Sequence, residues 1–320
     1  MTTQPVRRIA WLAGMTVLVA LLALAVRRID LARAATELHT VRIAWLVAAV
    51  PCFLIILPLW ATEWHILAPR SRDNTVRTML GVVAMTSSTM NTSPFFVGEA
   101  VGVVLLVTRA GLTRAAALSV LAMDQLVVGI AKLVVLALAA LLLSLPNWMG
   151  AGVSALGAGV AALLVTCLLA AWNHDAIAAR AARVLPDRMA SALGNIAASL
   201  APLRSPERAS RVLFLALAKR AVEVLAIVCV QRAFGVTLPL ASAVLVLASL
   251  NLATLLPVTP GNAGVYEAAV VVTYTHLGLR AEQALGMAVL QHACYMIALA
   301  LPGYAWLARA GMPRAAKAAS

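Results

Sequence analysis

Long apolar runs separated by short polar segments make up most of the chain. A helix needs roughly 20 apolar residues to cross a bilayer core of about 30 Å. Tryptophans fall near the ends of several runs, where an amphipathic ring prefers the headgroup region. The pattern predicts an all-α polytopic membrane protein with about six transmembrane helices: Ile9 to Val26, Ile43 to Ala61, a long one within Thr113 to Leu145, Gly150 to Trp172, Val212 to Phe234, and Ala284 to Ala308.

Two further apolar stretches are interrupted by polar and helix-breaking residues. Met79 to Thr108 breaks at TSSTMNTSP, and Ala241 to Leu277 breaks at LPVTPGNAGVYE. At 1.5 Å per residue the second arms, Gly98 to Thr108 and Gly264 to Leu277, reach only about 15 to 21 Å. A backbone break at membrane depth is tolerated only where protein or water surrounds it, so we expect two re-entrant helical hairpins. The residues expected to form the breaks are Pro94, Gly98, Pro257, Pro260, Gly261 and Gly264.

Composition and charge support a membrane protein. Of 320 residues 63% are apolar and 12% charged, against about 25% charged in soluble domains, and the mean hydropathy is +0.95. A net charge of +13 in a soluble chain would suggest a nucleic-acid partner. Here the arginines stand singly at the ends of apolar runs, which argues against nucleic acid. They are more frequent on one set of alternating loops, which predicts both termini in the cytoplasm.

The sizeable polar segment from Asn173 to Arg211 is expected to be a cytoplasmic amphipathic linker. Met189, Leu193, Ile196 and Leu200 recur at helical spacing, which favours a helix lying on the inner leaflet. A plain connector is the alternative. A biosynthetic enzyme is a possible partner at this linker.

One order of elements occurs twice. GEA at Gly98 to Ala100 is followed, after a short apolar arm, by GLTRAAALSVLAMDQ, and YEA at Tyr266 to Ala268 is followed by GLRAEQALGMAVLQH. An ordinary span precedes each unit, and three crossings separate them, so the units enter from opposite faces. This is the inverted repeat of many transporters. We therefore expect a single membrane domain over residues 1–320, with one repeat at about 43–145 and the other at about 212–308.

The paired motifs resemble a known family. P-x-x-x-GE at Pro94 to Glu99 and PVTPGNAGVYE at Pro257 to Glu267 are similar to the flippase-like membrane family typified by the transmembrane domain of lysylphosphatidylglycerol synthase, with hopanoid-associated relatives. The resemblance spans roughly residues 5–310. It implies lipid translocation in a bacterial inner membrane and no aminoacyl transfer. The chain departs from the family at Gly102, where an arginine is usual, and at Asn262, where a glycine is usual.

Two glutamates lead the candidate site. Charges within the hydrocarbon region cost about 2.5 to 3.5 kcal/mol each on insertion scales, so they usually face a cavity or a partner. Glu99 and Glu267 each stand at the start of a half-helix after a break. They either tune the positive field that the two helix N-termini offer to a lipid phosphate, or they cap their own helix starts.

Further charges lie inside the predicted spans. Lys219 and Glu223 are four residues apart, which favours an internal ion pair with Arg220 extending toward the membrane surface; alternatively Lys219 or Arg220 meets an anionic headgroup. Asp124 is either a proton or cation site or a structural partner for Lys132 or Arg220. The predicted substrate-binding residues are Glu99, Glu267, Asn91, Ser93, Asp124, Lys219, Arg220, Asn262 and Tyr266.

These patterns lead to a functional hypothesis. The sequence contains no metal-ligand constellation, phosphate-binding loop or nucleophile triad, so we expect no metal, no cofactor and no enzymatic activity. The expected function is a flippase that moves an anionic lipid headgroup through a groove between two re-entrant hairpins. The alternatives are a non-transporting accessory protein of lipid or glycolipid biosynthesis, and a secondary transporter of a small solute.

Overall fold

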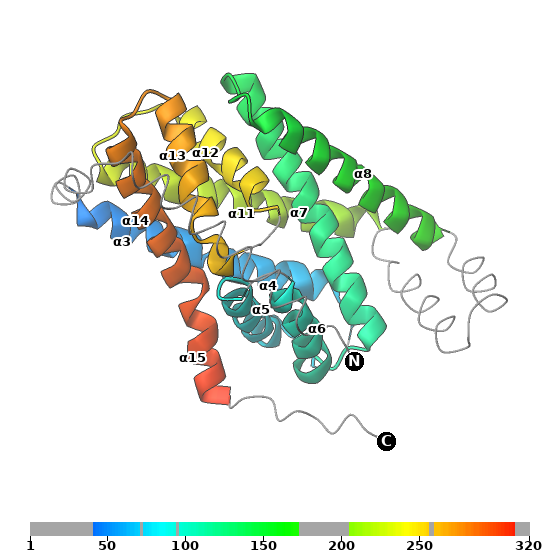
Figure 1. The fold of residues 1–320 in the computed structure, drawn as a ribbon. Helices are drawn as coiled ribbons and strands as arrows, with labels where there is room; N and C mark the ends of the chain where they lie inside the picture. Colours follow the sequence, from blue (N-terminus) through cyan, green and yellow to red (C-terminus); the bar gives the residue numbers. More distant parts are fainter. Residues whose placement is uncertain (1–40, 71–72, 94–95, 173–204, 256–258, 311–320) are drawn as a thin grey trace, which may run out of the picture.

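The computed structural model describes residues 41–70, 73–93, 96–172, 205–255 and 259–310. Figure 1 shows these residues as a bundle of helices, and no strand occurs among them. The predicted all-α class is therefore confirmed for the described part of the chain. The first predicted span, the predicted amphipathic helix before residue 205, Pro94 and Pro257 lie outside the described residues.

Helices divide into two series that are joined through α8. The first series consists of α3 (Ile43–Leu54), α4 (Ile56–Leu67), α5 (Val76–Met90), α6 (Val97–Arg109) and α7 (Arg114–Leu142), and it is followed by α8 (Met149–Trp172). The second series consists of α11 (Pro206–Ala233), α12 (Leu240–Ala253), the 3-10 turn η2 (Pro260–Asn262), α13 (Val265–His276), α14 (Ala281–Leu299) and α15 (Leu301–Ala310).

Four helical stretches are long and apolar enough to cross a membrane: Ile43–Leu67, Arg114–Leu142, Met149–Thr166 and Ala281–Ala308. They correspond to four of the six predicted spans. The predicted span from Val212 lies within α11, whose 28 residues extend about 42 Å but which carries several charges. The first residues of α11, 206–211, were expected to belong to the linker and are helical instead.

Proline explains the interruption between α3 and α4. Pro58 has no N–H to donate to the carbonyl of Leu54, four residues earlier, so the hydrogen-bond ladder fails there and Ile55 separates the two helices. The chain nevertheless continues in one direction to Leu67, six residues beyond the predicted end of this span at Ala61. The extension brings Glu63 into the bundle interior, where its side chain is fully buried.

The two series pack against each other with corresponding contacts. In the first, α4 contacts α5, α5 contacts α6 and α6 contacts α7; in the second, α11 contacts α12, α12 contacts α13 and α13 contacts α14. Between the series, α3 and α4 lie along α11 (Figure 1). The two ends of this contact are marked by the hydrogen bond from Arg42 N–H to Ala233 O (2.9 Å) and by the Lys219–Glu63 ion pair. The core therefore lies where the two series meet.

The exterior of the bundle is strongly apolar. Large hydrophobic side chains are exposed on α3, α7, α8, α11 and α12, among them Ile43, Leu141, Val165, Phe214 and Leu240. Exposed apolar side chains on this scale mark a contact with protein or membrane, and the four long apolar helices favour a membrane. Charged side chains lie in the interior beside apolar ones: Glu63, Asp124, Lys219 and Glu223 are all buried.

Candidate functional site

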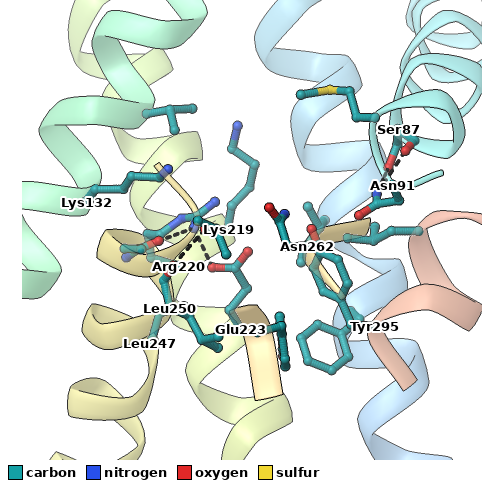
Figure 2. Close-up of a pocket in the computed structure, with 18 of the residues that line it drawn as sticks. Ser87, Asn91, Lys132, Lys219, Arg220, Glu223, Leu247, Leu250, Asn262 and Tyr295 are labelled. Atoms are coloured by element: carbon teal, nitrogen blue, oxygen red, sulfur yellow. Dashed lines mark hydrogen bonds and ion pairs between the residues drawn. The ribbon is translucent and has the colours of Figure 1, made fainter. Parts of the chain in front are cut away.

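A cavity of about 420 Å³ with charged residues in its wall lies at the junction of the two series. Its wall is built by α3, α4, α5, α6 and α7 of the first series and by α11, α12, η2, α13 and α14 of the second. Figure 2 shows its polar side chains converging from several helices. The charged residues of the wall are Glu99, Asp124, Lys132, Lys219, Arg220 and Glu223.

Lys219 forms its ion pair with α4. Its Nζ lies 2.6 Å from Glu63 Oε2, with the two side chains 3% and 0% exposed, and 5.7 Å from the centre of the Trp60 ring. The predicted pairing of Lys219 with Glu223 is therefore wrong. Both residues lie on one side of α11, but the antiparallel α4 places a carboxylate directly against the ammonium, and Glu223 is taken by another cation.

That cation is Arg220. Its Nη1 lies 2.7 Å from Glu223 Oε2 and donates to Asn251 Oδ1 of α12 at 3.2 Å. The expectation that Arg220 extends to the membrane surface is wrong. Glu223, three residues later on α11, and the Asn251 amide of α12 hold the guanidinium at the cavity. Figure 2 shows the pair between α11 and α12.

Asp124 and Lys132 lie on the same helix but do not pair. Asp124 Oδ1 accepts a hydrogen bond from Trp60 Nε1 at 3.0 Å, so the predicted pairing of Asp124 with Lys132 or Arg220 is not found. Among the described residues no carboxylate forms an ion pair with Lys132. Figure 2 shows its side chain extending from α7 toward Arg220. Lys132 is thus a cavity cation that no described carboxylate contacts in an ion pair.

The two breaks meet at the cavity. Asn91 at the end of α5 and Asn262 in η2 both line it, and Asn262 Oδ1 is buried with no partner among the described residues. Gly261 is buried and has a φ of +60°. A Cβ built on it would lie 2.7 Å from the Asn91 carbonyl oxygen. Since no side chain fits between the two backbones, this contact requires glycine.

The remaining predicted residues of the breaks have separate positions. Gly98 packs directly on the backbone of Met90, so that α6 can turn closely back on α5. Pro260 is exposed at the start of η2, and Ser93 is half-buried outside the cavity wall. Tyr266 lines the cavity and accepts a hydrogen bond from Gln291 Nε2 at 2.8 Å.

Glu267 is engaged at the start of α13. Its Oε2 accepts a hydrogen bond from the Gly264 N–H at 2.6 Å, and its Oε1 lies 2.6 Å from His292 Nδ1. The His292 ring stacks on Tyr266 with centroids 4.2 Å apart. Glu267 therefore makes the capping contact that one of the two sequence interpretations requires, and it is not part of the cavity wall.

Glu99, its counterpart in the first series, is placed differently. It stands in the first turn of α6 and lines the cavity. Its Oε2 is buried without a partner among the described residues. The two glutamates are equivalent in sequence, yet only Glu99 presents a free carboxylate oxygen at the cavity.

Residues 11–303 match the family model described as lysylphosphatidylglycerol synthase TM region. The chain belongs to this family. This match confirms the resemblance found in the sequence motifs. Together with the four long apolar helices, it shows that this member of the lysylphosphatidylglycerol synthase TM family is a multi-pass membrane protein. No curated protein and no solved structure matches the chain.

One residue of the site in this family member was missed by the sequence analysis. Glu63 neutralises Lys219, but the predicted span ended at Ala61 and left the carboxylate in a loop. A usable signal was the continuing apolar run WHIL at residues 64–67. It shows that Thr62 and Glu63 interrupt the span without ending it.

Gly261→Ala is expected to destabilise the protein by about 1–3 kcal/mol, because an alanine here combines a left-handed backbone with overlap on the Asn91 carbonyl. The loss should appear as a lower midpoint of thermal unfolding in detergent. Gly235→Ala is the control: it also has a positive φ, +67°, but nothing lies within 4 Å of the added methyl. Equal losses in the two variants would show that the contact with Asn91 contributes nothing.

Proposed function

We propose that this protein is a flippase that moves the headgroup of an anionic lipid between the leaflets of a bacterial inner membrane. It has both termini in the cytoplasm and catalyses no covalent chemistry. Membership of the lysylphosphatidylglycerol synthase TM family relates the chain to membrane lipid metabolism. The lipid tails remain in the bilayer while the headgroup passes through the cavity.

The observation that carries this proposal is a charged cavity inside an apolar bundle. Charges at membrane depth are costly and characteristically line substrate pathways. Two of the three cavity cations are neutralised by carboxylates, Lys219 by Glu63 and Arg220 by Glu223. Lys132 is left as the cation that a lipid phosphate can neutralise.

Two helix starts add to the positive field. The cavity is lined by Glu99 in the first turn of α6 and by Tyr266 in the first turn of α13. Each helix N-terminus is equivalent to roughly +0.5 elementary charge. With 13 and 12 residues, these helices reach only about 20 and 18 Å. We therefore place each at the tip of a re-entrant hairpin, α5–α6 and α12–α13, in an inverted repeat, which the corresponding contacts of the two series support.

The test is headgroup exchange in reconstituted liposomes. The protein is inserted into vesicles containing an anionic phospholipid, a zwitterionic phospholipid or a polyprenyl phosphate, each labelled on the headgroup. Protection from a membrane-impermeant quencher is then followed over time. We expect faster exchange of an anionic lipid than in empty vesicles. No exchange of any lipid by folded, inserted protein would contradict the proposal and favour the accessory role, while saturable uptake of a small solute would favour a solute carrier.

Glu99→Gln and Glu267→Gln are expected to separate function from stability. At an effective dielectric constant near 20, a charge about 10 Å away contributes roughly 1–2 kcal/mol. Removing the Glu99 charge should therefore tighten phosphate binding and slow exchange about tenfold through slower release, at unchanged stability. Glu267→Gln instead removes the carboxylate that contacts His292 and the Gly264 N–H and should lower stability by about 1–3 kcal/mol.

The two variants are compared in the same liposomes and by thermal unfolding in the same detergent. The isosteric change leaves the side-chain volume nearly constant in both. A stability loss in Glu99→Gln as large as that in Glu267→Gln would show that Glu99 serves its own helix start and has no separate role at the cavity.

A further inference from the structure

Two carboxyl groups and one ammonium group are packed together at the cavity wall, with Asp124 and Lys219 in the wall and Glu63 behind it. Glu63 is 0% exposed and lies 2.6 Å from Lys219 Nζ. Asp124 is 3% exposed and is an electrostatic neighbour of Glu63; its partner Trp60 stands three residues before Glu63 on α4. Trp60 Nε1 donates to Asp124 Oδ1 at 3.0 Å. Three helices, α4, α7 and α11, thus bring this cluster together.

The cluster has an unbalanced charge when every group is ionised. Two carboxylates and one ammonium sum to one negative charge, and a buried unpaired charge is strongly unfavourable. The other charged or titratable groups on the packed elements do not remove it. Arg220 and Glu223 neutralise each other. His65 is hydrogen-bonded to Asn74. Lys132 has Arg220 and Glu223 as its electrostatic neighbours. Glu99, which interacts with Asp124, adds further negative charge.

Two neighbouring buried carboxyl groups also favour a shared proton. Ionised carboxylates are acceptors only, so one of them must carry a hydrogen before they can bond. Apart from the Lys219 ammonium, no group in the described ranges donates to either oxygen of Glu63. The geometry points to a proton-binding site: we propose that Glu63 and Asp124 share one proton, which enters and leaves through the cavity.

The position of the pair gives the proton a route. Asp124 and Lys219 line the cavity, whereas Glu63 lies behind them. A proton from cavity water therefore reaches Asp124 first, forming one O–H bond on a carboxylate oxygen and releasing water from hydronium. Loss of the proton leaves one extra negative charge on the cavity wall.

This charge couples the proton to an anionic ligand. The protonated wall favours a phosphate group and the deprotonated wall repels it, so each ligand raises the affinity for the other, because linkage is reciprocal. The coupling rests on the function proposed above, but the proton site itself does not. A proton gradient is thus a source of energy for directed lipid movement.

Infrared difference titration tests the site without any transport. The purified protein in liposomes is titrated with acid and base, and the carbonyl band of a protonated carboxyl group is followed with its shift in deuterium oxide. We expect one such band in the wild type that is absent in Asp124→Asn. The asparagine amide donates permanently to Glu63, keeps the Lys219–Glu63 pair intact, and needs no proton. Glu223→Gln, which removes a different buried carboxylate, should retain the band.

A second variant tests whether the loss of the band in Asp124→Asn comes from a disturbed fold. Glu63→Gln combined with Lys219→Met removes the carboxyl pair without leaving an unpaired charge, and it should also lack the band. A band of unchanged size and pH midpoint in Asp124→Asn or in this double variant would overturn the proton site. So would a wild-type protein in which no carboxyl group titrates.

Headgroup exchange at several pH values separates the two proposals. Wild-type exchange should change by about tenfold across the midpoint of the band, within the usual range of coupling between sites, whereas Asp124→Asn should be independent of pH. A titrating band that Asp124→Asn removes, found together with no lipid exchange, would support the proton site and contradict the flippase. Lipid exchange without any titrating band would support the flippase and contradict the proton site.

Discussion

Lys132→Gln is expected to slow the exchange of an anionic headgroup by about 10- to 100-fold while the protein remains folded. A hydrogen bond to a charged group contributes about 1.5–3 kcal/mol, and every 1.4 kcal/mol is about tenfold in an equilibrium constant. Without this contact, capture of the headgroup replaces its release as the slow step. Lys132 faces the cavity, and no carboxylate in the described part of the chain pairs with it, so its removal orphans no anion there. Initial exchange rates in matched liposomes measure the effect.

The control for Lys132 is a cation on the same helix. Arg114 begins α7 and is exposed, so Arg114→Gln removes one positive charge without touching the cavity and should leave the rate within about twofold if field effects at that distance are screened. Lys132→Arg should retain most of the rate because the charge is kept. An exchange rate in Lys132→Gln equal to that of the wild type would remove Lys132 from the headgroup path.

Lys219→Met is expected to cause the largest loss of stability, about 3–5 kcal/mol. Breaking a buried ion pair by removing one partner leaves the other charge uncompensated, and Glu63 is fully buried. The midpoint of thermal or denaturant unfolding in detergent should fall sharply. Adding Glu63→Gln to Lys219→Met should recover most of the loss, since neither charge then remains.

An exposed pair on the same helix provides the matched control for Lys219. Arg211 Nη2 lies 2.7 Å from Glu207 Oε1, but the side chains are 67% and 72% exposed. Arg211→Met should cost at most about 1 kcal/mol, as for most surface ion pairs. If the double variant of Glu63 and Lys219 were no more stable than Lys219→Met alone, the loss would come from packing of the lysine stem and not from the unpaired carboxylate.

The sequence predicts what depends on local pattern. Apolar run length predicted four of the observed long helices, and the polar breaks were found where α5 ends at Met90 and where η2 begins at Pro260. Glycine at position 261 was expected in a break, and the structure adds the reason, which is contact with the Asn91 backbone. Such patterns are local in the sequence, so helices and breaks can be predicted from them without knowing which helices are in contact.

The ion pairs could not be predicted in the same way. Lys219 and Glu223 have a favourable helical spacing, but so do Arg220 and Glu223, and local spacing cannot choose between them. The choice depends on α4, whose Glu63 reaches Lys219 from a distant part of the chain. The different environments of Glu99 and Glu267 likewise follow from His292, which stands beside only one of them. Partners supplied by tertiary packing leave no periodic signal in the chain.

The contact of Gly261 with the Asn91 carbonyl has a mechanical consequence. Two backbones in contact with no side chain between them form a stiff contact, because no flexible side chain can adjust when their separation changes. We therefore expect any movement that changes the shape of the cavity to keep the distance between Asn91 and Gly261 nearly constant. Spin labels close to these two residues should keep their separation when an anionic lipid is added.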